Sequence, residues 1–129
     1  MTKNYYEPCE ELKQCNEFIE KYYKTGDYVT CFQEHMKLAK KGYPLAECQI
    51  GWFYYSGLGV ERNENEAFLW TKRAAEHGDR DAQNNLGEFY EEGIGTEKDL
   101  EQAKAWYVKA AQNDSPEGIE KCLALGIEY

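Results

Sequence analysis

The chain has 129 residues, a formal net charge of −9 and no run of about 18 apolar residues that would span a membrane. Its length corresponds to one domain, and its apolar fraction of 42% is too high for a disordered chain. The negative charge argues against nucleic acid and against an anionic membrane surface as partners. It favours a basic protein or peptide, unless the charge only keeps the protein soluble. No signal-peptide core is present, so we expect a cytoplasmic location.

The N-terminal part, residues 5–42, is predicted to form a divergent helix pair. Its first helix is expected over Glu10–Lys24. Three residues of this helix are expected to face inward: Phe18, Ile19 and Tyr22. The second helix is expected within Asp27–Gly42, where it matches the second half of the repeats that follow.

Residues 43–78 are predicted to form a second helix pair. Pro44 opens the first helix, and Gly57–Gly59 breaks it because glycine adopts a positive φ. Asn63 is expected to cap the second helix, and Gly51 to let another backbone come close. The expected inward positions are Ala46, Ile50 and Tyr54 in the first helix, and Ala67, Trp70, Ala74 and Ala75 in the second.

Residues 79–114 repeat this pattern. A shift of 36 residues superimposes the two copies with eleven identities, all but one at small or aromatic residues that packing requires. Gly93–Gly95 takes the place of the earlier glycine turn, and Asp99 takes the place of the cap. Chance does not account for such a match, so the sequence predicts two copies of one structural unit.

Residues 115–129 are predicted to form a capping helix. Ser115, Pro116 and Glu117 make a strong helix start, with a cap, a proline in the first turn and an acidic residue. Terminal units of a repeat array are expected to depart from the pattern. The sequence therefore predicts one all-α domain of about seven helices in antiparallel pairs.

The two central copies share a set of positions: Ala46, Ile50, Gly51, Tyr54, Gly57, Gly59, Ala67, Trp70, Ala74 and Ala75 in the first, and Ala82, Leu86, Gly87, Tyr90, Gly93, Gly95, Ala103, Trp106, Ala110 and Ala111 in the second. With this pattern the chain resembles the Sel-1-like repeat family, a branch of the tetratricopeptide-type solenoids. It departs at Thr96, where the family usually has Val, and at Asp114, where it usually has Gly. The resemblance implies a right-handed α/α superhelix and an adaptor or scaffold role in protein–protein contacts.

Residues with reactive side chains do not form a recognisable catalytic or metal-binding motif. The five cysteines lack CxxC spacing, so we expect free thiols, with Cys31 in the core and Cys48 exposed. His35 and His77 have no partner at catalytic or metal-ligand spacing, and we expect structural or solvent-exposed roles for them. We therefore expect no enzyme activity, no metal and no cofactor.

Binding is expected on the concave face, which the first helix of each pair lines in a solenoid. The variable positions there are the predicted contacts with a partner: Gln49, Trp52, Tyr55, Asn85, Glu88 and Glu91. Trp52 is the central candidate, because Glu88 takes its place in the next copy and the core therefore needs no aromatic ring there. The alternative is that the N-terminal helix covers Trp52.

Three functions are compatible with the sequence. The first is an adaptor that binds a protein or peptide, which we expect to be basic. The second is an immunity protein or antitoxin-like inhibitor that neutralises a basic toxin. A hydrolase is a more distant third, and it would require a deep pocket with convergent carboxylates and a histidine. The residues do not fix the oligomeric state, and a monomer is the simplest expectation.

Overall fold

The structure of the protein is a computed structural model that describes residues 10–129. Over that range it contains seven α-helices and no strand, which confirms the predicted all-α class. The helices are α1 Glu10–Phe18, α2 Tyr28–Ala39, α3 Pro44–Ser56, α4 Glu64–Glu76, α5 Arg80–Glu92, α6 Leu100–Gln112 and α7 Pro116–Leu125. A π-helical turn, Ile19–Tyr23, extends α1. The expected start of the first helix pair at residue 5 lies outside the described residues.

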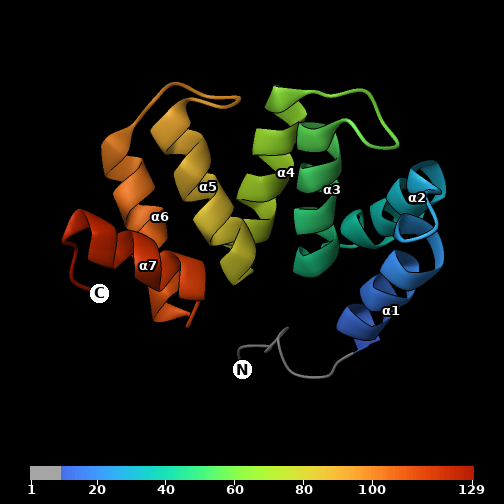
Figure 1. Ribbon diagram of the computed structural model, residues 1–129, viewed down its shortest axis with the longest axis horizontal. Helices are drawn as coiled ribbons and strands as arrows, with labels where there is room; N and C mark the ends of the chain where they lie inside the picture. The colour runs from blue at the N-terminus through green and yellow to red at the C-terminus, as the bar shows by residue number, and fades with distance from the viewer. Residues whose placement is uncertain (1–9) are drawn as a thin grey trace.

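The helices are arranged as a solenoid in chain order (Figure 1). Each of the two central repeats is a tightly packed pair, α3 with α4 and α5 with α6. Contacts of α2 with α3, of α4 with α5 and of α6 with α7 join neighbouring pairs. The turns that link α3 to α4 and α5 to α6 lie on the same side of the row, at the top of the view (Figure 1). In this repeating arrangement, α3 and α5 are the first helices of two successive pairs.

The predicted helix caps are confirmed. Asn63, Asp99 and Ser115 each accept a hydrogen bond from a backbone N–H in the first turn of the helix that follows. Asp79, which the sequence analysis did not single out, caps α5 in the same way and is fully buried. Side-chain oxygens at this position satisfy amides that have no partner within the helix.

Two glycines set the distance between the helices of each central pair. A Cβ at Gly51 would collide with Thr71 Oγ1, and a Cβ at Gly87 would lie 2.5 Å from Tyr107 Cε1. Thr71 and Tyr107 occupy the same position in the two copies, 36 residues apart. The second helix of each pair therefore packs directly on the glycine backbone, as the sequence predicts for Gly51.

Two further glycines connect each unit to the one before it. Gly59 has a φ of 72° and lies against the backbone carbonyl of Tyr28, at the start of α2. Gly95 has a φ of 68° and lies against the carbonyl of Glu64, at the start of α4. Both the positive φ and the missing Cβ are needed there. Each glycine turn therefore covers the start of the second helix of the preceding unit.

The N-terminal core is built around a buried histidine. His35 is fully buried, between the rings of Phe18 at 5.2 Å and Phe53 at 5.8 Å. Its Nδ1 lies 2.8 Å from the carbonyl oxygen of Cys31, which can only accept, so the proton is on Nδ1. Its Nε2 is buried and has no hydrogen-bond partner among residues 10–129. Burial lowers the pKa of His35, against an opposing effect of the Cys31 carbonyl.

Replacement of Gly51 by alanine is expected to destabilise the protein by about 1–3 kcal/mol, because the new methyl group overpacks the contact with Thr71. Urea unfolding monitored by circular dichroism measures this loss. In the double variant Gly51→Ala/Thr71→Ala the colliding hydroxyl is gone, so the loss should be smaller than the sum of the two single losses. Strictly additive losses would contradict the proposed role of this contact.

Acid is expected to destabilise the protein through His35. The unfolded chain binds a proton near the ordinary histidine pKa of about 6.5, whereas the folded state resists protonation. This contribution to stability is complete above that pH and is lost as the pH falls below it. The urea midpoint of unfolding should therefore decrease more between pH 7.5 and pH 5.0 for the wild type than for His35→Leu.

The comparison with His35→Leu is needed because other groups titrate in the opposite sense. Burial raises the pKa of the Asp81 and Glu88 carboxyls, so their protonation adds stability as the pH falls. The wild type and His35→Leu share this contribution, so it cancels when the pH dependence of one is subtracted from that of the other. Parallel pH profiles for the wild type and His35→Leu would show that His35 is not the acid-sensitive group.

Candidate functional site

A small pocket of about 170 Å³ lies between the two first helices α3 and α5. Its lining residues are Trp52, Tyr55, Thr71, Asn85, Glu88, Phe89, Glu92 and Ile94. We call it the α3–α5 pocket. Four of the six predicted contact residues line it: Trp52, Tyr55, Asn85 and Glu88. The other two do not, since Gln49 is half-buried one turn earlier in α3 and Glu91 pairs with α7.

Aromatic side chains form the wall of the α3–α5 pocket on the side of α3. Trp52 is 45% exposed, so the N-terminal helix does not cover it. Its ring lies 6.2 Å from that of Tyr55, which in turn lies 5.6 Å from Phe89. Arg62 places its guanidinium 5.4 Å from the Tyr55 ring and donates a hydrogen bond from Nε to the Tyr55 carbonyl oxygen. The Trp52 ring is therefore the accessible part of this wall.

The floor of the pocket is Thr71, which comes from α4. Its side chain passes the backbone of Gly51 and is almost completely buried. Sequence analysis did not identify this residue as part of a site, because a threonine on a second helix carries no binding signal by itself. The only indication was the difference in size from Tyr107 at the same position of the next copy.

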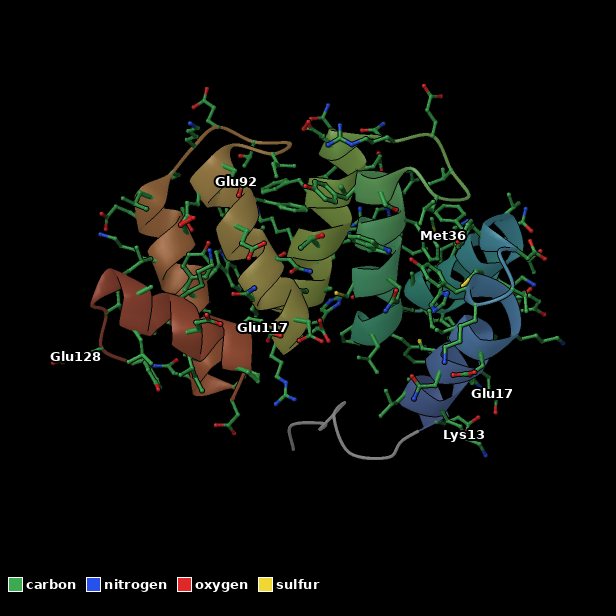
Figure 2. All side chains as sticks on the ribbon, viewed as in Figure 1. Lys13, Glu17, Met36, Glu92, Glu117 and Glu128 are labelled. Carbon is green, nitrogen blue, oxygen red and sulfur yellow. The ribbon has the colours of Figure 1, made fainter. Side chains whose placement is uncertain are left out.

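Carboxylates form the opposite rim. Glu88 and Glu92 both come from α5, and Glu92 lies in its last turn (Figure 2). Burial raises the pKa of the Glu88 carboxyl; Glu92 and Glu91 raise it further, whereas Lys121 lowers it. A raised pKa shows that the surrounding protein disfavours the negative charge of Glu88. A cation that binds beside Glu88 would stabilise this negative charge.

Neither histidine contributes to the pocket. His35 lies in the N-terminal core, and His77 directly follows the end of α4, where its Nδ1 lies 2.6 Å from Glu47 Oε1. The carboxylates at the pocket therefore have no histidine beside them, unlike the arrangement expected of a hydrolase. Within the part of the chain that the structure describes, no cluster of three or more His, Cys, Asp or Glu side chains is arranged to hold a metal ion.

Cys31, Cys48 and Cys122 are free thiols, and burial raises the pKa of each of them. Cys15, Cys31 and Cys122 are buried, and burial raises the pKa of Cys31 to about 11. Cys48, which we expected to be exposed, is half-buried and packs against the core of the central repeats. Burial raises its pKa well above the ordinary value, and Asp79 raises it further. Cys9 lies outside the described residues.

Comparison with known proteins identifies the repeats. The Sel1 repeat profile matches residues 44–79 and 80–115. Over 53 residues the chain is 40% identical to a chitin synthase regulator of Saccharomyces cerevisiae, a match that covers 41% of this chain and only 8% of that protein. No helix among residues 10–129 has the length and apolar character needed to cross a membrane.

Solved structures give the same result for the fold. A Sel1 repeat protein from Oxalobacter formigenes superimposes with a TM-score of 0.75 at 37% identity, over 84% of this chain and 43% of that one. A protective antigen present in uropathogenic Escherichia coli strains, which displays the SLR fold, gives a TM-score of 0.72 at 27% identity, over 91% of this chain and 26% of that one. The chain thus spans less than half of each of these relatives. Because the two matched repeats cover more than half of its own length, the chain belongs to the Sel1 repeat family.

Proposed function

We propose that this protein is a non-enzymatic binding module that holds a basic protein or peptide against α3 and α5. Sel1 repeats are in general protein–protein interaction modules, which supports the first part of the proposal. The expected contact residues are Gln49, Trp52, Tyr55, Asn85, Glu88 and Glu91. We expect this interaction to take place in the cytoplasm.

The observation that carries the proposal is the exposure of Trp52. The residues on either side of it in α3, Gly51 and Phe53, are buried in the core, whereas Trp52 is 45% exposed at the edge of a pocket. A large exposed aromatic side chain beside a pocket is a frequent centre of binding energy in protein interfaces. Trp52 thus has the position of an anchor for a partner.

Charge supports a basic partner. The chain carries a formal net charge of −9, and the rim of the pocket carries Glu88 and Glu92. Complementary charge speeds association and rejects acidic competitors. Because exposed charges are screened by salt, the interaction should weaken as the ionic strength rises.

Replacement of Trp52 by alanine is expected to leave the fold intact and to abolish partner binding. The free energy of unfolding should change by less than about 1 kcal/mol, since Trp52 is an exposed residue. The same change at the neighbouring buried Phe53 should cost about 3–5 kcal/mol. Chemical unfolding of the two variants measures both values.

Binding is measured by affinity capture from the source cell followed by quantitative mass spectrometry. The wild-type bait should enrich a basic protein that high salt removes, and the Trp52→Ala bait should not. Leu69→Ala is the matched control, because Leu69 is 46% exposed on α4 and lies outside the pocket. Equal capture by the wild type and Trp52→Ala, or an equal loss with Leu69→Ala, would refute the proposal.

A further inference from the structure

Two successive grooves of the solenoid are built from the same positions. Asp79 caps α5 and Ser115 caps α7, and the two caps are 36 residues apart, so positions in these helices correspond one to one. The α3–α5 pocket is one groove. The next lies between α5 and α7, and we call it the α5–α7 groove. It contains Tyr107, Lys121 and Glu91.

The α5–α7 groove already holds a cation. The ammonium group of Lys121 lies 5.5 Å from the centroid of the Tyr107 ring and 3.9 Å from Glu91 Oε2. An aromatic face and a carboxylate together attract a cation more strongly than either alone. The protein therefore shows in its own structure how a groove between two first helices binds a lysine side chain.

The α3–α5 pocket lacks these two occupants. Asn85 stands where α7 has Lys121, and Thr71 stands where α6 has Tyr107. With asparagine in place of lysine the pocket has no cation of its own, and with threonine in place of tyrosine it has a short side chain where the other groove has a ring. The pocket is therefore open, with Thr71 as its floor and two carboxylates, Glu88 and Glu92, on its rim.

In the aromatic wall of this pocket, Arg62 lies over the Tyr55 ring, whereas the Trp52 ring has no cation over it among residues 10–129. Arg73 lies 4.5 Å from the centroid of the Trp70 ring, and Lys109 lies 4.3 Å from that of Trp106. Of the three tryptophans, the one that lines the pocket is thus the one without such a partner within the described part of the chain.

We propose that the α3–α5 pocket takes a lysine side chain of the partner, in the groove equivalent to the one that Lys121 fills. Because Tyr55 and Thr71 stand where the α5–α7 groove has Glu91 and Tyr107, the groups that hold this lysine are different ones. This inference rests on the proposed function and specifies which group of the basic partner is recognised. The ammonium group lies against the Trp52 ring and between the Glu88 and Glu92 carboxylates. Neutralisation of the lysine, for example by acetylation, removes both attractions.

The experiment uses the indole N–H signals of the three tryptophans in a ¹⁵N-labelled full-length chain. Single Trp→Phe variants assign the signals, and hexalysine is the probe. The Trp52 signal should shift in a saturable way, whereas those of Trp70 and Trp106, which already carry a cation, should move much less. Hexalysine acetylated on all six side chains is the control, and it should leave the Trp52 signal unmoved.

A second test fills the pocket from within. Asn85→Lys introduces into α5 the lysine that α7 has at the same position, so it should occupy the pocket and weaken hexalysine binding on the order of tenfold. Gln112→Lys is the matched control, because it makes the same change of charge at an exposed position at the end of α6. Its effect should be less than about twofold.

The outcomes separate this inference from the proposed function. A Trp52 signal that does not move, or that moves no more than those of Trp70 and Trp106, overturns the lysine proposal. So does an equal loss of hexalysine binding in Asn85→Lys and Gln112→Lys. In either case the proposed function still stands if capture of the partner depends on Trp52. If Asn85→Lys does not fold, the signals of the wild-type chain still decide the matter.

Discussion

The close contact between Gly51 and Thr71, and its counterpart between Gly87 and Tyr107, determines most of what is distinctive in this protein. With no Cβ on the first helix, the second helix of each pair packs against backbone. The side chain opposite the glycine then reaches the groove between this first helix and the first helix of the next unit. Its size decides whether that groove is filled, as with Tyr107, or open, as with Thr71. One packing constraint thus positions both the core and the candidate site.

The two central repeats share their core and differ in the side chains at their grooves. Alanines and a phenylalanine hold equivalent buried places in both copies, whereas Trp52 in α3 is replaced by Glu88 in α5. Such differences do not disturb the packing, because the side chains concerned are partly exposed. Each groove of the solenoid can therefore have different binding side chains while the core packing stays the same. In this chain one groove is closed by an internal lysine and the preceding one is open.

Local features of the fold were predictable from the sequence, and features that depend on distant contacts were not. The caps Asn63, Asp99 and Ser115 follow from neighbouring residues, and the 36-residue period follows from self-similarity. The exposure of Trp52 stayed undecided, since it depends on where α1 lies. The complete burial of His35, and the role of Thr71 as a pocket floor, depend on side chains more than ten residues away along the chain, which no local pattern records.

The glycine turns also have a consequence for how the solenoid comes apart. Gly59 covers the start of α2, and Gly95 covers the start of α4, so each turn belongs structurally to the unit before it. The units that these contacts hold together are therefore offset from the repeats that the sequence displays. A cut between residues 78 and 79 follows the sequence period but removes the turn that covers α4. For dissecting or recombining such arrays, the natural boundary lies after the glycine turn and not at the end of the repeat.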